Sequence, residues 1–170
     1  MPENVQPSNI QRSTPQRSNA RALFPVTTES VEETQALGAQ LAETLDAGAV
    51  LALYGDLGTG KTHLVKGIAQ GLGLDPATVR SPTFTILQTY EDGRRPLYHF
   101  DAYRVQTPDE FVELGFEEYV HDDGITCIEW AGRVESLLPP HTLRLTLTHV
   151  AEHRRRIALP SSRDTAAPGS

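Results

Sequence analysis

Residues 50–63 read V-L-A-L-Y-G-D-L-G-T-G-K-T-H, an apolar run that gives way at Gly55 to a glycine-rich loop. The loop fits the pattern G-x-x-x-x-G-K-S/T, with Gly55, Gly60, Lys61 and Thr62 in the defining positions. In this pattern the glycines let backbone N–H groups curl around phosphate oxygens, the lysine reaches the β- and γ-phosphates, and the hydroxyl binds Mg²⁺. The stretch therefore predicts a phosphate-binding loop.

The residues on either side of the loop support this interpretation. Val50–Tyr54 reads as a buried strand, and a helical pattern runs from about Lys61 to Leu72. This order of strand, loop and helix places a phosphate at the N-terminus of a helix. A glycine-rich turn that binds nothing is the alternative. We expect these loop residues to contact a nucleotide: Asp56, Leu57, Gly58, Thr59, Gly60, Lys61 and Thr62.

Length and composition limit the classes of function. A chain of 170 residues with 38% hydrophobic content can hold one sizeable core, so we expect one domain. The net charge of −7 argues against a protein that grips DNA or RNA by itself. No apolar run approaches the ~18 residues of a membrane span. We expect a cytoplasmic protein with no membrane contact, in which the single cysteine, Cys127, belongs to the core.

Two polar tails flank the predicted domain. Residues 1–22 are rich in Gln, Ser, Asn, Pro and Arg, and residues 161–170 have a similar composition. Such segments bury too little apolar surface to offset the entropy that ordering costs. We therefore expect disordered tails at 1–22 and 161–170, and a P-loop ATPase domain at 23–160.

The pattern between the tails predicts the α/β class. We expect a single P-loop NTPase-like domain, in which helices pack on a mixed sheet that contains antiparallel hairpins. Ser30 and Glu33 have the spacing of a capping box ahead of a helix. The expected helices are 31–46, 61–72, one or two within 108–121, and 131–138; the expected strands are 24–26, 50–54, 125–130, and the hairpins 83–90 with 96–103 and 142–150 with 156–159.

Two acidic residues stand where strands end. Asp101 follows the apolar run 97–100, and Glu129 follows 125–128. Ligands of open α/β sheets gather at the carboxyl ends of strands, so either acid can hold Mg²⁺ directly or through water. The alternative is that each acid simply faces solvent. We predict that both acids complete the phosphate site.

Three further residues near these acids leave two interpretations open. Ser81 and Thr83 precede a strand, where hydroxyls either meet a γ-phosphate or its metal, or cap a local proline turn. Trp130, the only tryptophan, either packs in the core or contacts the nucleotide or a partner.

The six histidines show no ligand spacing, so we do not expect a zinc site. The acidic segment 109–123 is either a solvated face or a docking surface for a basic partner.

Four motifs in order resemble those of a known family. They are G-D-L-G-T-G-K-T (55–62), S-P-T-F (81–84), Y-H-F-D-A-Y-R (98–104) and I-E-W (128–130). Together they resemble the TsaE family, formerly YjeE, over residues 26–158. This family consists of small bacterial ATPases needed to make threonylcarbamoyladenosine in tRNA. The four motifs in this order are specific, although no single one would be.

The resemblance implies a function and partners. It implies a Mg²⁺-dependent ATPase that acts beside a TsaD–TsaB complex, which modifies adenosine 37 of tRNAs that read codons beginning with A. The tRNA would then be contacted only indirectly. Two alternatives remain, a small P-loop kinase and a nucleotide-gated binding module that does not hydrolyse ATP. The chain lacks the N-K-x-D pattern that would indicate a GTPase.

The resemblance also implies roles for individual residues. The segment containing Ser81 and Thr83 corresponds to a switch in the family. His63 departs from the Ser or Thr that often follows the loop threonine. The residues implied to serve ATP and Mg²⁺ are Lys61, Thr62, Asp101 and Glu129, with Trp130 beside them and with Val31 and His153 on the adenine side.

Overall fold

The sheet is built around the strand that leads into the phosphate loop. The structure is a computed structural model that describes residues 15–161, with side chains from residue 19 onward. Its strands are β1 (Val26–Thr28), β2 (Val50–Tyr54), β3 (Leu87–Tyr90), β4 (Leu97–Asp101), β5 (Ile125–Glu129), β6 (Leu143–Ala151) and β7 (Arg154–Ala158). Its helices are α1 (Pro15–Ala22), α2 (Val31–Ala42), α3 (Lys61–Gly71), α4 (Asp109–Glu113) and α5 (Phe116–Val120), with short 3-10 helices η1 (Pro76–Thr78) and η2 (Ala131–Leu137).

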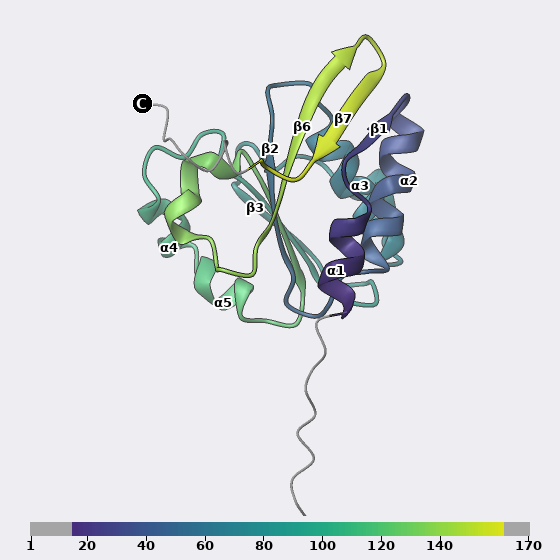
Figure 1. The fold of residues 1–170 in the computed structure, drawn as a ribbon. Helices are drawn as coiled ribbons and strands as arrows, with labels where there is room; N and C mark the ends of the chain where they lie inside the picture. Colours follow the sequence, from purple (N-terminus) through teal and green to yellow (C-terminus); the bar gives the residue numbers. More distant parts are fainter. Residues whose placement is uncertain (1–14, 162–170) are drawn as a thin grey trace, which may run out of the picture.

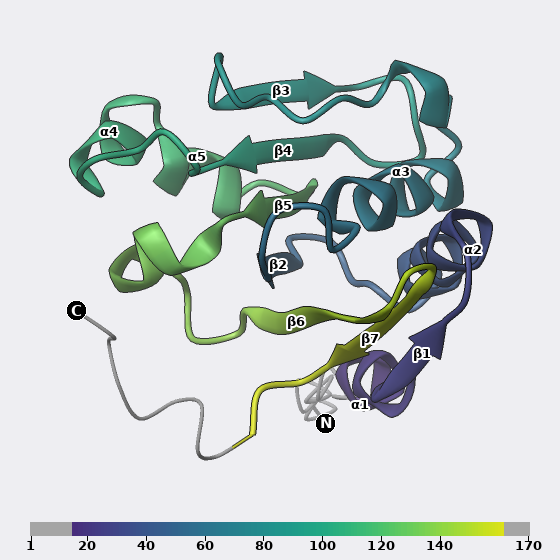
Figure 2. The same ribbon diagram turned by 90° about the horizontal axis from the view of Figure 1, so that it is seen from above.

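Within the described range the strands form one seven-stranded sheet in the order β1-β7-β6-β2-β5-β4-β3. The four central strands run parallel, since β2 pairs in parallel with β5 and β6, and β5 pairs in parallel with β4. Both edges are antiparallel, with β3 against β4 on one side and β1 and β7 on the other. Figure 2 shows this succession from β3 to β1. The predicted α/β class with a mixed sheet is confirmed.

β2 is buried on both faces because helices cover the sheet on both sides. Leu51 and Leu53 pack in one apolar cluster, and Val50 and Ala52 pack in the other. This is the pattern of a central parallel strand, whose side chains alternate between two covered faces. The structure confirms the predicted strand at Val50–Tyr54 and so fixes the place where the phosphate loop begins.

Helices α1, α2 and α3 cover one face of the sheet (Figure 1). Glycines let α2 and α3 approach closely: a Cβ at Gly38 would lie 2.4 Å from the Leu64 carbonyl oxygen, and one at Gly67 would lie 2.1 Å from that of Gln35. Neither helix can accept a side chain there without moving apart. α3, which follows the phosphate loop, is therefore packed closely against α2.

Helices α4, α5 and η2 cover the opposite face. Aromatic rings fill this layer, with Phe100 of β4 lying 5.1 Å from Phe111 and 5.3 Å from Phe116, measured between ring centroids. Such tilted and edge-on contacts stabilise a core beyond the area that the rings bury. The two short helices confirm the prediction for 108–121 and support β4 from behind.

Both predicted hairpins form. In the β3–β4 hairpin the first strand is shorter than predicted, and in the β6–β7 hairpin the turn is shorter than predicted. β3 begins at Leu87, because Ile86 has a left-handed φ of 68° and residues 81–86 turn toward the end of β4. β6 and β7 pair antiparallel and project beyond the rest of the sheet (Figure 1). α2 ends at Ala42 instead of residue 46, since the Thr44 hydroxyl donates to the Leu41 carbonyl oxygen and closes the last turn.

The predicted N-terminal tail is wrong over its second part. Residues 15–22 form α1, and Ala20 is buried in the cluster beneath the sheet. The composition of this segment predicts disorder, but docking against the core offsets the entropy of ordering. The remaining tail predictions, residues 1–14 and 162–170, lie outside the described residues.

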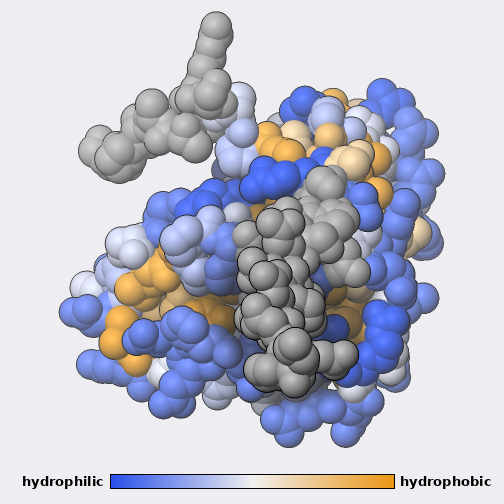
Figure 3. Space-filling model, turned by 60° about the horizontal axis from the view of Figure 1, so that its bottom comes forward, coloured by the Kyte–Doolittle hydropathy of each residue, from blue (hydrophilic) through white to orange (hydrophobic). Residues whose placement is uncertain are grey.

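The surface is mostly polar on the face shown in Figure 3, where apolar colour is confined to separate patches. No helix among the described residues is both long enough and apolar enough to span a bilayer.

Candidate functional site

The loop between β2 and α3 has the backbone shape that its sequence predicts. Gly55 has a φ of 146° and Gly60 has a φ of 99°, values that residues with a Cβ rarely adopt. A Cβ at Gly55 would also lie 2.4 Å from the Leu147 carbonyl oxygen. The Thr59 hydroxyl donates to the Asp56 carbonyl oxygen at 2.9 Å and closes the loop from within. α3 then begins at Lys61, so its free N–H groups face the loop.

Lys61 lies almost wholly inside this loop, with only 4% of the residue exposed. Its Nζ donates to the carbonyl oxygens of Gly55 at 2.6 Å and Asp56 at 2.8 Å. The same ammonium lies 4.2 Å from the ring centroid of Trp130. Burial lowers the pKa of Lys61, and the nearby carboxylate of Glu129 opposes that shift. A negatively charged partner next to Lys61 therefore stabilises the charged form of its side chain.

The two strand-end acids come together as predicted. Asp101 and Glu129 are register partners on β4 and β5, and they are 1% and 3% exposed. Neither faces solvent, so the alternative of two solvated acids is wrong. Buried carboxylates require hydrogen bonds or a cation. Each of the two has a different set of partners.

Glu129 is bonded through both of its carboxylate oxygens. The Thr62 hydroxyl donates to Oε1 at 2.8 Å, and His99 Nε2 lies 2.6 Å from Oε2. A threonine hydroxyl that donates its proton keeps its oxygen lone pairs free. Thr62 is thus oriented so that its oxygen can accept a cation.

Asp101 is bonded to the segment that precedes β3. Ser81 and Thr83 both donate their hydroxyl protons to Oδ2, the latter at 3.2 Å. The backbone N–H of Tyr103 donates to Oδ1 at 2.8 Å. The hydroxyls of the S-P-T segment therefore meet a site carboxylate, and the alternative of a purely local proline turn is wrong.

A cavity of about 870 Å³ opens at this edge of the sheet. Of the predicted site residues, Asp56 and Thr59 do not line it: the side chain of Thr59 points into the loop, and both contribute to loop shape instead. The cavity brings together the other predicted residues, which are Val31, Leu57, Gly58, Gly60, Lys61, Thr62, Ser81, Thr83, Asp101, Glu129, Trp130 and His153.

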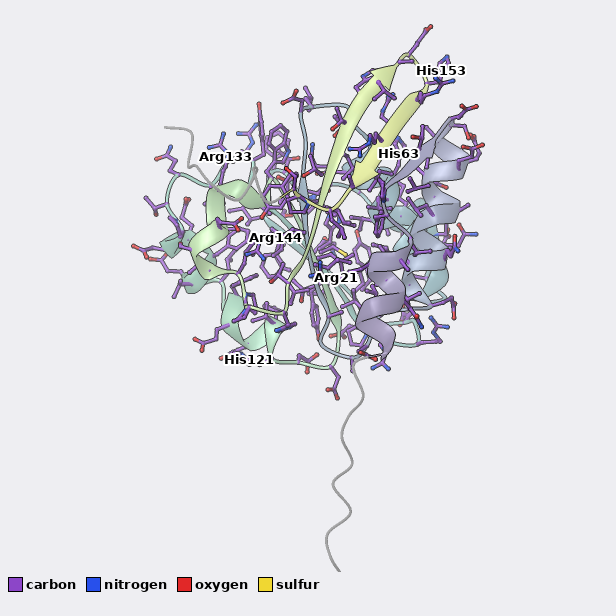
Figure 4. All side chains as sticks on the ribbon, in the orientation of Figure 1. Arg21, His63, His121, Arg133, Arg144 and His153 are labelled. Atoms are coloured by element: carbon purple, nitrogen blue, oxygen red, sulfur yellow. The ribbon has the colours of Figure 1, made fainter. Side chains whose placement is uncertain are left out.

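Strand pairing explains how distant residues reach one cavity. β1 pairs with β7, with Thr28 opposite Arg155, so the start of α2 lies beside the tip of the β6–β7 hairpin. Val31 is 45% exposed at the start of α2. His153 lies at the hairpin tip and His63 lies lower, beside β7 (Figure 4). The cavity therefore extends from the phosphate loop to the start of α2 and the hairpin tip.

Sequence reasoning missed several lining or supporting residues. Arg155 lines the cavity and donates through Nη2 to the Gly58 carbonyl oxygen at 3.3 Å. His63 also lines it, and burial together with the positive charges of Lys66 and Arg155 lowers its pKa. Only tertiary pairing of β7 brings Arg155 here, so no local signal identifies it.

Sequence reasoning also missed His99 and Tyr103, although a local signal for His99 exists. His99 and Asp101 are two apart on β4, so they point to the same face of the sheet. Tyr103 lies 5.0 Å from Trp130 between ring centroids, and both rings line the cavity. Trp130 has a left-handed φ of 58°, and it packs partly against the aromatic cluster while its ring meets Lys61. The packing interpretation of Trp130 is therefore confirmed in part, and its contact with a nucleotide or a partner stays a prediction.

The donor set fits Mg²⁺ held jointly with phosphates. Hard oxygen donors are available from Thr62, Asp101 and Glu129, and Mg²⁺ in nucleotide sites takes one or two carboxylates together with substrate oxygens. Among the described residues no group of three or more His, Cys, Asp or Glu side chains could hold a metal alone. The site therefore suits a metal that arrives with a nucleotide.

Other candidate features lie away from the cavity. Cys127 is fully buried in the middle of β5, and burial raises the pKa of its thiol. Cys127 thus belongs to the apolar core, as predicted. The acidic side chains of 109–123 are mostly exposed, and the docking hypothesis for them stays a prediction.

Comparison with known proteins points to one family. A family model described as "Threonylcarbamoyl adenosine biosynthesis protein TsaE" matches residues 28–157. A Bacillus subtilis (strain 168) protein named tRNA threonylcarbamoyladenosine biosynthesis protein TsaE is 44% identical over 130 residues, which cover 76% of this chain and 80% of the relative. A Treponema pallidum (strain Nichols) protein of the same name is 40% identical over 130 residues, which cover 76% of this chain and 95% of that relative.

The fold is shared with a solved structure. The crystal structure of Bacillus subtilis YdiB matches with a TM-score of 0.66 and 36% sequence identity, over 84% of this chain and 88% of that chain. The region that the family model matches, 28–157, contains the phosphate loop, both strand-end carboxylates and the tip of the β6–β7 hairpin.

Proposed function

We propose that this chain, which belongs to the TsaE family and has its role in tRNA threonylcarbamoyladenosine biosynthesis, acts there by binding and hydrolysing Mg²⁺-ATP. The cavity beside the phosphate loop is the proposed ATP site. The observation that carries the proposal is the convergence of Lys61, Thr62, Asp101 and Glu129 on this one cavity. The proposed reaction is attack of water on the γ-phosphoryl group, which releases ADP and phosphate.

Lys61 supplies positive charge to the phosphates. Its buried ammonium bonds two loop carbonyl oxygens, and a phosphate offers a stronger, charged acceptor in the same place. The free N–H groups at the start of α3 add donors for the same oxygens. Phosphoryl transfer depends mainly on such positioning and charge neutralisation. Val31 and His153 lie on the side proposed for adenine.

Thr62, Asp101 and Glu129 are the residues proposed to hold Mg²⁺, directly or through water. When bound, the metal neutralises charge on the transferring phosphoryl group. Glu129 holds the Thr62 hydroxyl in place, and Asp101 holds the Ser81 and Thr83 hydroxyls. The two acids therefore link the loop and the S-P-T segment to one centre, as an ATP-dependent switch requires.

The proposed partner is a TsaD–TsaB-type protein complex, with tRNA contacted only indirectly. The net charge of −7 supports this assignment, because a chain that binds RNA alone presents a basic surface to the phosphates. The proposed place of action is the cytoplasm. In this scheme ATP hydrolysis resets the partner complex and changes no tRNA atom itself.

Phosphate release by the purified full chain tests the proposal, with and without Mg²⁺ and with and without the partner complex. We expect Mg²⁺-dependent release that the partner complex stimulates. Release that requires a small phosphate acceptor would favour the kinase instead. Tight ATP binding with no release in any condition would favour the non-hydrolysing binding module. Either result would overturn the ATPase assignment.

A further inference from the structure

A buried histidine lies beneath the strand-end carboxylates. His99 is in the middle of β4, has no exposed surface and does not line the cavity. It shares a face of the sheet with Asp101, whereas Tyr98 and Phe100 pack in the cluster on the opposite face. An imidazole in an apolar layer is costly unless it is hydrogen-bonded. The bond that His99 makes therefore indicates its role.

That bond is to Glu129. His99 Nε2 lies 2.6 Å from Glu129 Oε2, and the two side chains are 0% and 4% exposed. The other ring nitrogen, Nδ1, has no hydrogen-bond partner among the described residues. A buried N–H without an acceptor is costlier than a bare ring nitrogen, so the proton belongs on Nε2. His99 then donates to the carboxylate.

Glu129 transmits this constraint to the phosphate loop. Its Oε1 accepts from Thr62 Oγ1 at 2.8 Å, while Oε2 is bonded by His99. Two donors from different elements thus fix both oxygens of one carboxylate and with them its plane. His99 lies in the rigid middle of a strand, whereas Thr62 is in the first turn of α3 and faces the cavity. In the series of hydrogen bonds from His99 through Glu129 to Thr62, His99 is therefore the end that the sheet holds in place.

We propose that His99 is a positioning residue: it sets the orientation of Glu129 and, through Glu129, of the Thr62 hydroxyl. The inference rests on the proposed ATPase function. His99 does not line the cavity, so its loss should lower turnover while ATP affinity is nearly kept. A histidine that merely fills the core would affect only stability. The two roles therefore differ in what they change.

A matched pair of variants separates these roles. His99→Gln can keep an N–H donor near the position of Nε2, and His99→Met has a similar shape with no donor. We expect His99→Met to lower kcat for ATP hydrolysis by ~10–100-fold, as loss of a supporting partner of a metal-site ligand does, with the KM for ATP within about threefold of wild type. His99→Gln should recover most of kcat. Equal kcat in wild type and a folded His99→Met would overturn the inference.

A double-variant cycle shows whether His99 acts through Glu129. In a Glu129→Gln background, adding His99→Met should cause little further loss of kcat, because the carboxylate that His99 orients is already absent. Losses that multiply fully would contradict the proposal. Thermal melting of each variant shows that the compared proteins are folded.

An NMR measurement separates this inference from the ATPase assignment. We expect a slowly exchanging imidazole N–H proton that disappears in His99→Gln and shifts in Glu129→Gln. If wild type hydrolyses no ATP but shows this signal, the proposed function is wrong and the anchoring of Glu129 stands. Absence of the signal together with normal kcat in His99→Met contradicts the anchoring alone.

Discussion

Asp101 and Glu129 are register partners at the ends of neighbouring parallel strands, yet each is tied to a different part of the site. Asp101 accepts hydroxyl protons from Ser81 and Thr83, which precede β3. Glu129 accepts the hydroxyl proton of Thr62, in the phosphate loop helix. Adjacent carboxylates thus connect two segments that are far apart in sequence. Movement of either segment changes the environment of an acid at the same centre.

Replacement of Lys61 should separate function from stability. Lys61→Met keeps the length of the side chain and removes its charge, so we expect ATP turnover to fall at least ~100-fold. The free energy of unfolding should stay within about 1 kcal/mol of wild type, because the cost of burying the ammonium offsets its hydrogen bonds. Phosphate release and urea unfolding measure the two quantities. Unchanged turnover would contradict the site assignment.

The same variant predicts a pH dependence. Burial lowers the pKa of Lys61 in the folded chain below the ordinary 10.5 of the unfolded chain. Between these two values the unfolded chain binds the extra proton, so rising pH favours folding of wild type. Across this alkaline pH range, the free energy of unfolding of wild type should therefore rise relative to that of Lys61→Met. Urea unfolding at a series of pH values measures the difference, and a gap that widens against wild type would contradict the sign.

The hydroxyls that bond Asp101 should hold the segment 81–86 in place. In the double variant with Ser81→Ala and Thr83→Val, amide hydrogens of this segment should exchange roughly tenfold faster or more, since two hydrogen bonds are lost. Thr78→Val is the matched control, because the Thr78 hydroxyl bonds only the local carbonyl oxygen of Asp75. Mg²⁺-ATP should slow exchange of this segment in wild type. Equal exchange in the double variant and the control would argue against a switch.

Trp130 should report nucleotide binding. It is the only tryptophan, and the Lys61 ammonium lies 4.2 Å from its ring centroid. Because the ammonium is expected to turn toward the phosphates, the fluorescence of Trp130 should change on addition of Mg²⁺-ATP. A titration followed by fluorescence and by calorimetry should give the same affinity. Binding by calorimetry without any change in emission would contradict the proposed movement.

Helix α1 should contribute to stability. Deletion of residues 1–22 removes the buried Ala20 and uncovers its neighbours in the core cluster, such as Phe24. We expect a loss of about 1–2 kcal/mol in the free energy of unfolding. Deletion of residues 1–14 alone is the reference, and the difference between the two deletions measures the contribution of α1. Equal stability after both deletions would show that α1 adds nothing to the fold.

Much of the site could be predicted because its parts are local patterns. The phosphate loop is encoded by a strand, glycines and a helix that are adjacent in sequence, so Lys61 and Thr62 were identified from one stretch. Asp101 and Glu129 could both be placed at the site because ligands gather at the carboxyl ends of strands, although the pairing of the two acids on neighbouring strands came from the structure.

The remainder depends on tertiary contacts. Arg155 reaches the cavity because β7 pairs with β6, which lies beside β2 and the phosphate loop that follows it. Helix α1 forms in a polar segment because Ala20 docks on the core, which local composition does not reveal. The bond between His99 and Glu129 required knowledge that β4 and β5 are neighbours, although strand alternation already put His99 and Asp101 on one face.

Single-turnover phosphate release by Glu129→Gln, compared with wild type at the same ATP occupancy, tests the central claim most directly. Glu129→Gln keeps the size of the side chain and an acceptor for the Thr62 hydroxyl, but it removes the charge beside Lys61 and Asp101. We predict that release slows by ~100-fold or more while the affinity for Mg²⁺-ATP changes only a few-fold. Glu135→Gln, an exposed acid paired with Arg144, is the matched control and should release phosphate like wild type. Release at the wild-type rate by folded, ATP-bound Glu129→Gln would contradict the account.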